Sequence, residues 1–138
     1  MKSSQNQLNN LKDKWVVFNP YVPLSGEEWM ETEFPEYSVS NLGRVRNTVK
    51  GNLLYGKLTK IGYQQVCLKS AGVLNFRYVH HLVLNAFRGS RPEGKETRHL
   101  NGIRSDNRLE NLAWGTRQEN MKDKIRHALI RLFNSMST

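Results

Sequence analysis

Short segments of strand-forming residues follow one another over residues 36–69, and four glycines separate them. The pieces YSVS, RVRN and YQQVCLK are rich in residues that favour strands and are bounded by residues that favour turns. They predict a small antiparallel sheet in this part of the chain. The preceding residues 1–14 are dominated by Ser, Asn, Gln and Lys and can bury little, so we expect a flexible arm there.

The period changes at Val79, where apolar residues begin to recur every three or four positions. The run VHHLVLNAF therefore predicts a short helix, which Gly89 and Pro92 end. Beyond this helix, the extended pieces TRHL and LAWG flank the polar loop NGIRSDNRLEN. This arrangement predicts a hairpin within residues 97–115.

A final helix is predicted to begin at Thr116, because Thr116 and Glu119 form a T-x-x-E capping box that satisfies two free backbone donors. This start places Asn120 in the first helical turn. Farther along, apolar residues form a stripe, which we interpret as core packing, with a homodimer contact as the alternative. The stripe consists of Met121, Ile125, Ala128, Leu129 and Leu132, with Phe133 and Met136 near its end.

The elements together predict an α+β fold, and the length of 138 residues allows one modest core or two very small modules. The formal net charge is +9, and it is unevenly distributed. Residues 1–40 hold 3 Lys and Arg against 6 Asp and Glu, whereas the remainder holds 18 against 6. A basic excess in the structured part favours a polyanionic partner, and nucleic acid is a better fit than anionic lipid.

The cysteine content and the first residues of the chain indicate the cellular compartment in which we expect the protein. Cys67 is the only cysteine, which excludes an internal disulfide and a multi-cysteine zinc site and fits a reducing compartment. The start MKSSQNQLNNLKDK has no apolar core of the kind that a signal peptide needs, and the apolar stretch over residues 15–24 is short and contains two prolines. We therefore expect a soluble, cytoplasmic protein without membrane contact.

The segment RHLNGIRSDNRLENLAWGTRQEN carries the candidate chemistry. It places His99 at a strand end, Asn111 at the far side of a loop and Asn120 at a helix start, so a hairpin and a helix can bring the three together. Over residues 78–123 the chain resembles the HNH endonucleases. The resemblance is to the phage and intron-encoded branch, in which a His-x-x-Gly loop leads into Asn-Leu-x-Trp and a helix beginning near Glu-Asn.

The upstream segment EEWMETEFPEYSVSNLGRVRN resembles a modular DNA-binding motif that is commonly joined to such nucleases. Its hallmark is Tyr-x-Val-Ser-Asn-x-Gly-Arg-Val, which residues 37–45 reproduce. Two signatures in their usual order are stronger evidence than either alone. We therefore expect the arm over 1–14, the DNA-binding motif with its small β-sheet over 15–75, and an HNH nuclease domain with a C-terminal amphipathic helix over 76–138.

The resemblance implies a ββα-metal fold that hydrolyses DNA phosphodiester bonds with a single divalent cation, most simply Mg²⁺ or Mn²⁺. His99 matches the general base, and an imidazole that titrates near neutrality suits that task. Asn111 matches an asparagine that braces the loop by bonding to backbone. Asn120 matches a ligand of the cation, whose charge stabilises the phosphoryl oxygens and the leaving 3′ oxygen.

One position departs from the family pattern. Arg98 stands where several relatives have an Asp or His ligand, and a guanidinium cannot bind a cation. We expect Arg98 to bind a phosphate and Asp123, three residues after Asn120 on the same helix, to supply the second ligand. An ordinary exposed helix charge is the alternative for Asp123. His80 is expected in a supporting or structural role rather than as a ligand.

The expected partner is double-stranded DNA, held through the phosphate backbone in the cytoplasm of a bacterial or phage-infected cell. A catalytically inactive DNA-binding or regulatory protein on an HNH scaffold is the alternative, and an RNA-binding protein is a weaker third. Nicking and double-strand cutting both stay open. Trp29, Tyr37 and Trp114 are interpreted as packing residues. The candidate DNA-binding residues are Arg44, Arg46, Lys57, Lys60, Arg104, Arg108, Arg117 and Lys122, with Arg44 and Arg46 ranked first.

Overall fold

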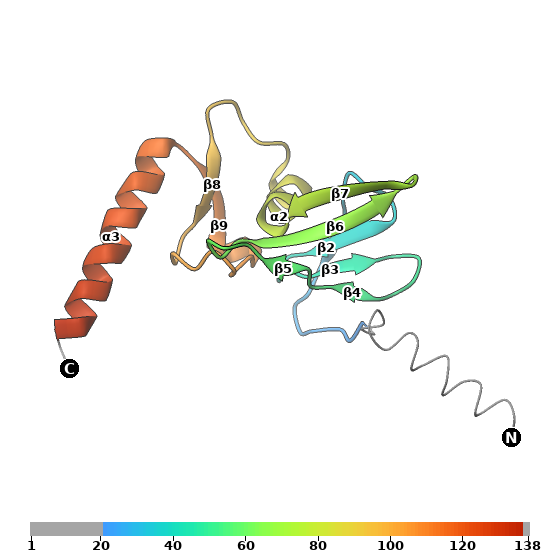
Figure 1. Ribbon diagram of the computed structural model, residues 1–138, viewed down its shortest axis with the longest axis horizontal. Coiled ribbons are helices and arrows are strands. Elements are labelled where there is room, and N and C mark those ends of the chain that lie inside the picture. Colours follow the sequence, from blue (N-terminus) through green and yellow to red (C-terminus); the bar gives the residue numbers. More distant parts are fainter. Residues whose placement is uncertain (1–20, 137–138) are drawn as a thin grey trace, which may run out of the picture.

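The computed structural model describes residues 21–136, in which small antiparallel sheets surround a short helix and a long helix extends away from them (Figure 1). The predicted arm over residues 1–14 lies outside the described residues. The mixed α+β architecture expected from the sequence is confirmed.

The first sheet has four strands in the order β1-β2-β3-β4, each antiparallel to the next. The predicted strands YSVS and RVRN correspond to β2 and β3, whereas β1 and β4 were not foreseen. The strands are β1 (Trp29–Glu31), β2 (Tyr37–Ser40), β3 (Val45–Asn47) and β4 (Leu53–Leu54).

The second sheet has the order β5-β6-β7 and consists of β5 (Lys57–Leu58), β6 (Gln64–Ser70) and β7 (Val73–Tyr78). The predicted strand YQQVCLK corresponds to β6. A two-residue turn joins β6 to β7, and both of its residues, Ala71 and Gly72, have positive φ, at 50° and 77°. This is the backbone geometry that matches the twist of a tight hairpin. The turn was not foreseen because Ala is uncommon in the left-handed region.

The predicted helix is α2 (Val79–Arg88), and its apolar face is buried over the first two turns and partly buried at Ala86 and Phe87. It packs with β2 and β3 of the first sheet and with β6 of the second, so one hydrophobic core crosses the boundary expected at residue 75. Tyr37 reinforces this connection, because its hydroxyl bonds to both the backbone N and O of Lys69 at 3.0 and 2.9 Å. Tyr37 is a core residue, as predicted, and Trp114 packs against the same core.

The predicted hairpin is formed by β8 (Glu96–His99) and β9 (Leu112–Gly115), which pair antiparallel. The 3-10 helix η1 (Leu109–Asn111) ends the long loop between them. The capping box that was predicted for the last helix is also present. Thr116 N donates to Glu119 Oε1 at 3.0 Å, and Glu119 N donates to Thr116 Oγ1 at 3.1 Å.

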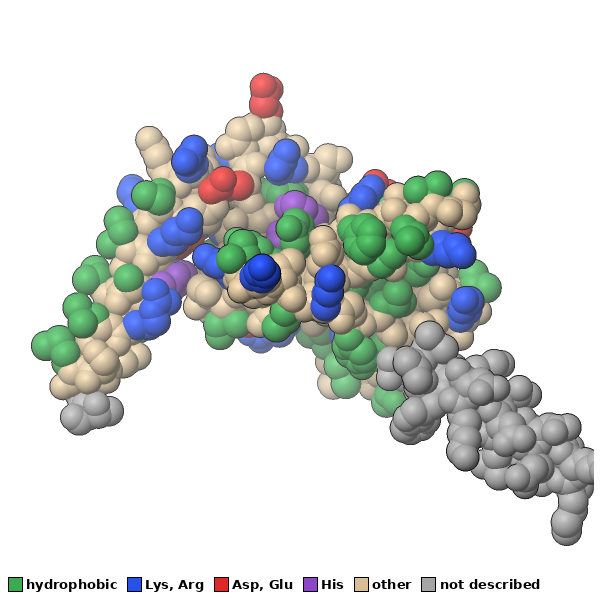
Figure 2. Space-filling model, in the orientation of Figure 1, with side chains coloured by type: hydrophobic (Ala, Val, Ile, Leu, Met, Phe, Trp, Pro, Cys, Tyr) green, Lys and Arg blue, Asp and Glu red, His purple; other side chains and the backbone are tan. Residues whose placement is uncertain are grey.

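The last helix, α3 (Arg117–Met136), does not pack as predicted. The apolar stripe faces solvent along the outer side of α3 (Figure 2), with Leu129 60%, Phe133 72% and Met136 76% exposed. The helix leaves the body of the protein at an angle, so that only its first turns meet β8 (Figure 1). Asp123 is its only buried residue within the described chain. The interpretation of the stripe as core packing is therefore wrong for this part of the chain.

No helix within residues 21–136 combines the length and the apolar composition that spanning a bilayer would require.

Candidate active site

A cavity of about 430 Å³ opens between β8, the start of α2 and the inner face of α3. It brings together five of the residues singled out from the sequence, namely His80, His99, Arg104, Asn120 and Asp123. Asn111 and Arg98 do not line the cavity but contact the loop and the helix that form it. Four cations also face the cavity, so an anionic ligand is electrostatically favoured there: Arg91, Arg104, Lys124 and Arg131.

His99 lies at the end of β8, and its Nε2 is 3.0 Å from Asn107 Oδ1. The rings of His80 and Tyr63 flank it, with centroids at 5.1 and 6.0 Å. Burial lowers the pKa of the His99 imidazole below its ordinary value, although the hydrogen bond to Asn107 raises it in part. The ring is therefore neutral at pH 7 and able to accept a proton.

His80, at the start of α2, is 5% exposed and is enclosed by aromatic rings. It stacks on Tyr78 at 5.2 Å and meets His81 edge-on at 4.4 Å. Burial, followed by the charges of His81 and His99, lowers the pKa of His80 to about 3. A ring that stays neutral and contacts mainly other rings suits the structural role proposed for it.

Asn111 bonds to the backbone of the loop that it closes. Its Nδ2 donates to Asp106 O at 2.9 Å, and its Oδ1 accepts from Asn101 N at 2.9 Å. A backbone bond from Leu100 N to Asn111 O, at 2.8 Å, ties the same residue to the end of β8. These are the contacts that a loop-bracing role requires.

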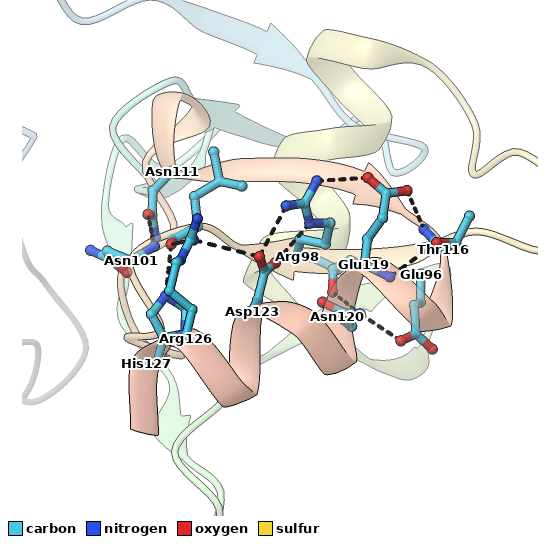
Figure 3. A network of polar contacts seen from close by, with 12 residues as sticks. Glu96, Arg98, Asn101, Asn111, Thr116, Glu119, Asn120, Asp123, Arg126 and His127 are labelled. Carbon is cyan, nitrogen blue, oxygen red and sulfur yellow. Dashed lines mark hydrogen bonds and ion pairs between the residues drawn. The ribbon is translucent and has the colours of Figure 1, made fainter. Parts of the chain in front are cut away.

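Asn120 is held by its amide nitrogen, which donates to Glu96 Oε1 at 2.5 Å and to Thr97 O at 3.1 Å (Figure 3). Its carbonyl oxygen Oδ1 is thus the atom able to bind a cation. Glu96 was not identified from the sequence. Its position two residues before Arg98 could have indicated it, because alternate residues of a strand point to the same face.

Arg98 and Asp123 form a bidentate ion pair, with Nε to Oδ2 at 2.8 Å and Nη2 to Oδ1 at 3.1 Å (Figure 3). Arg98 also reaches Glu119 at 3.1 Å. The hydrogen bond from Arg98 holds the pKa of the Asp123 carboxyl below its usual range. Gly115 makes room for this side chain, since a Cβ there would overlap Arg98. Both oxygens of Asp123 are therefore engaged, and the guanidinium faces α3.

The ion pair between Arg98 and Asp123 bears on the roles predicted for both residues. Asp123 lines the cavity, but the ion pair competes with its expected role as a ligand. Arg98 is committed to two carboxylates and does not line the cavity, so it is not placed to bind a phosphate there. Polar contacts rather than apolar ones attach α3 to β8, and His127 Nε2 adds another at 2.9 Å from Leu100 O.

The hallmark motif over residues 37–45 directly contacts the loop between β8 and β9. Asn41 O accepts a bond from Leu109 N at 2.8 Å. Gly43, with φ of 81°, lies so close that a Cβ would meet Asn107 C and O at 2.9 Å. Both the left-handed backbone and the close approach demand glycine at this position of the motif.

Half of the candidate DNA-binding residues are engaged within the protein. Arg44 is paired with Glu27 and bonds to Val22 O at 2.7 Å, and its side chain is 15% exposed. Arg46 lies over the ring of Trp29 at 4.2 Å, so Trp29 is half-buried beneath a cation rather than in the core. The other two engaged residues are Arg104, bonded to Ile61 O, and Arg108, paired with Asp106 and Glu110.

The other four are exposed and remain candidates: Lys57, Lys60, Arg117 and Lys122. Sequence reasoning missed Lys124 and Arg131. Both follow Asn120 at helical spacing and share its face of α3, which is a signal that could have identified them. Lys and Arg side chains gather along the inner side of α3 in Figure 2.

Within residues 21–136, no three His, Cys, Asp or Glu side chains form a cluster able to hold a metal ion. The cavity instead offers the Asn120 amide oxygen beside the Glu96 carboxylate. Such a pair fits Mg²⁺ or Mn²⁺ in a phosphoryl-transfer site, because Mg²⁺ takes one or two carboxylates and completes its shell with water and substrate phosphate.

Family models match two parts of the chain. Residues 77–122 match the HNH endonuclease family, and residues 27–69 match the NUMOD4 motif. The chain contains an HNH endonuclease domain preceded by a NUMOD4 motif. Both resemblances predicted from the sequence are thus confirmed, in the predicted order. The NUMOD4 motif and the HNH domain lie on either side of the expected boundary at residue 75, although the core is shared between them.

Two proteins that contain HNH endonuclease domains are similar to this chain over most of its length. The uncharacterized HNH endonuclease L247 of Acanthamoeba polyphaga mimivirus is 34% identical over 124 residues, covering 88% of this chain and 29% of that protein. The DNA endonuclease I-HmuI of Bacillus phage SP01 is 31% identical over 100 residues, covering 71% of this chain and 58% of that protein. The chain thus spans less than two thirds of the length of both relatives.

The solved structure of I-HmuI, an HNH homing endonuclease that binds and cleaves DNA, is also similar to this chain. The TM-score is 0.66 at 30% identity, and the match covers 73% of this chain and 59% of that one. A solved HNH endonuclease structure therefore shares the fold over 73% of this chain.

Proposed function

We propose that this chain is a metal-dependent DNA endonuclease that hydrolyses phosphodiester bonds with His99 as general base. The observation that supports this most directly is the cavity itself. It presents a neutral imidazole, an amide oxygen beside a carboxylate, and four cations around a space large enough for a phosphodiester. The similar protein I-HmuI is a DNA endonuclease, and we extend double-stranded DNA to this chain as a proposed substrate.

In this proposal His99 removes a proton from a water molecule that then attacks phosphorus. Asn111 keeps the loop closed and so holds the end of β8, with His99, in place. Lys124 and Arg131, which line the cavity from α3, bind phosphates on either side of the cleaved bond. His80 stays neutral behind His99 and adds no competing charge.

Asn120 Oδ1 and Glu96 are the residues that would hold the divalent cation. When bound, that cation neutralises charge on the phosphoryl oxygens and stabilises the leaving 3′ oxygen. Glu96 is proposed in place of Asp123, because its carboxylate is beside Asn120 and faces no cationic partner among the ion pairs of residues 21–136.

The test of the nuclease activity uses supercoiled plasmid with Mg²⁺, with Mn²⁺ or without a cation. Wild-type protein is expected to relax or linearise the plasmid only with a cation, and His99→Ala to abolish cleavage. Lys50→Ala, on an exposed turn, is a control that should cleave normally. If wild-type protein binds the DNA and leaves it intact with every cation, the chain is a DNA-binding protein on an HNH scaffold and the proposal fails.

The cation site has a test that needs no cleavage, because Mn²⁺ bound to the protein can be measured by electron paramagnetic resonance. Glu96→Gln keeps an acceptor for Asn120 Nδ2 but loses the charge, so Mn²⁺ affinity should fall at least about tenfold. Glu93→Gln, three residues earlier and exposed, should bind Mn²⁺ like the wild type. Equal affinity in both variants would exclude Glu96 as a ligand.

A further inference from the structure

We propose that Gln64 of the second sheet and Asn107 of the loop between β8 and β9 form a hydrogen-bond relay that keeps the proton of neutral His99 on Nε2. The ring then presents the lone pair of Nδ1 to the attacking water. This inference rests on the proposed role of His99 as general base. It assigns a positioning role to Gln64, a residue that belongs to the part of the chain matching the NUMOD4 motif.

The direction of the relay follows from its far end, where the acceptor is unambiguous. Tyr55 contributes a backbone carbonyl, which can only accept, so the group that meets it at 2.8 Å is the Gln64 amide nitrogen. Gln64 Oε1 must then face the relay, and it accepts from Asn107 Nδ2 at 3.0 Å. Asn107 Oδ1 is therefore the atom 3.0 Å from His99 Nε2, which must donate.

The relay resists reversal because every alternative leaves two like groups facing each other. Turning the Asn107 amide over would bring its nitrogen to His99 and its oxygen to Gln64 Oε1. Turning both amides over would bring Gln64 Oε1 against the Tyr55 carbonyl instead. Asn107 is 3% exposed, so water cannot compensate for a mismatch between its amide and Gln64. At the exposed Tyr55 end, turning both amides over would lose the 2.8 Å hydrogen bond to the carbonyl.

The backbone of Asn107 is fixed as well as its side chain. Gly43 packs directly against it, and Leu109, two residues on, is bonded to Asn41 O at 2.8 Å. Gln64 itself lies in β6, which is paired on both sides, with β5 and with β7. A rigid sheet therefore sets the position of the amide that orients the base, as a second layer of partners does for the histidine ligands of metal sites.

The first measurement is the tautomer itself, read from long-range ¹H–¹⁵N couplings of ¹⁵N-labelled protein at a pH where His99 is neutral. The His99 signals are those missing from His99→Gln. We expect the pattern of a single tautomer protonated at Nε2. A pattern protonated at Nδ1, or an even mixture, would overturn the relay without any variant of Gln64.

The second measurement compares variants at position 64. Gln64→Leu removes the partner of Asn107, so the His99 pattern should become mixed and kcat for plasmid cleavage should fall about 10- to 100-fold with KM unchanged. Gln64→Glu still accepts from Asn107 Nδ2 and should keep the Nε2 tautomer, because the bond that it loses, to Tyr55 O, is exposed and water can replace it. Gln65→Leu, the neighbour whose side chain points to the other face of β6, is the matched control.

The outcomes separate the relay from the nuclease proposal. If Gln64→Leu changes neither the tautomer nor kcat, the relay is wrong. If no variant cleaves DNA but the tautomer changes as described, the relay stands and the nuclease proposal fails. Should Gln64→Leu not fold, the wild-type and Gln64→Glu spectra still decide, because both must show the proton on Nε2.

Discussion

The ion pair between Arg98 and Asp123 gives a prediction that separates a structural role for Asp123 from a role in cation binding. Arg98→Ala leaves the Asp123 carboxylate, 9% exposed, with Arg126 at 3.5 Å as its remaining cation. Arg126 is 57% exposed and therefore compensates little. We expect Arg98→Ala to destabilise the protein markedly and Asp123→Asn to leave Mn²⁺ binding unchanged.

The magnitude follows from the burial of the pair. Removing one partner of a buried ion pair costs about 3–5 kcal/mol, because the other charge stays desolvated. The Arg98 side chain is 19% exposed, so water reaches the gap and the lower end, about 3 kcal/mol, applies. For a chain of this size that corresponds to a fall in Tm of roughly 10 °C. Glu119→Gln removes only the more exposed contact and should cost under about 1 kcal/mol.

Urea unfolding of Arg98→Ala, Asp123→Ala and the double variant forms a double-mutant cycle. The loss of unfolding free energy in the double variant should be about 2 kcal/mol smaller than the two single losses added together, because the double variant leaves no unpaired charge. The pKa of Asp123 is lowered in the folded state, so this stability is complete above about pH 4 and is lost as the pH falls through the folded pKa. A loss below about 1 kcal/mol in Arg98→Ala, together with a tenfold weaker Mn²⁺ affinity in Asp123→Asn, would refute the reasoning and restore Asp123 as a ligand.

Three further predictions concern residues around the site. His80 is protonated in the unfolded chain below about pH 6.5 but in the folded protein only near pH 3. The free energy of unfolding should therefore fall as the pH is lowered across that window, by up to about 1.4 kcal/mol per pH unit. His80→Phe should reduce this dependence of the unfolding free energy on pH. Thr116→Ala removes the cap of α3 and should cost about 1 kcal/mol in thermal unfolding, whereas Thr116→Ser should cost almost nothing. Gly43→Ala should destabilise by about 1–3 kcal/mol and shift the His99 signals, because a Cβ would press on the Asn107 backbone; unshifted signals would contradict the contact described between them.

The elements that local sequence determines were predicted well. The capping box of Thr116 and Glu119 acts within four residues, and the apolar spacing of α2 is a property of one helix. The outer stripe of α3 shows the limit of such reasoning. Periodicity indicates that a helix has an apolar face, but it does not say whether a second surface meets that face.

The contacts that define the site were beyond the sequence because they join distant residues. Arg98 and Asp123 are 25 positions apart, and Gln64 and Asn107 are 43 apart. The motif around Arg44 was expected to contact DNA, yet Arg44 is occupied by Glu27, 17 positions earlier. Residue type predicted which side chains carry charge, whereas the fold decides which of those charges are already neutralised within the protein.

The loop between β8 and β9 is tied from within by Asn111 and from outside by Asn41. A mobile loop would lose backbone entropy worth about 1–2 kcal/mol per residue when it ordered around a substrate. Here folding has already restricted those residues, so the loss is not subtracted from the free energy of association with DNA. Contacts formed at the scissile phosphate can then stabilise the transition state instead of organising the loop.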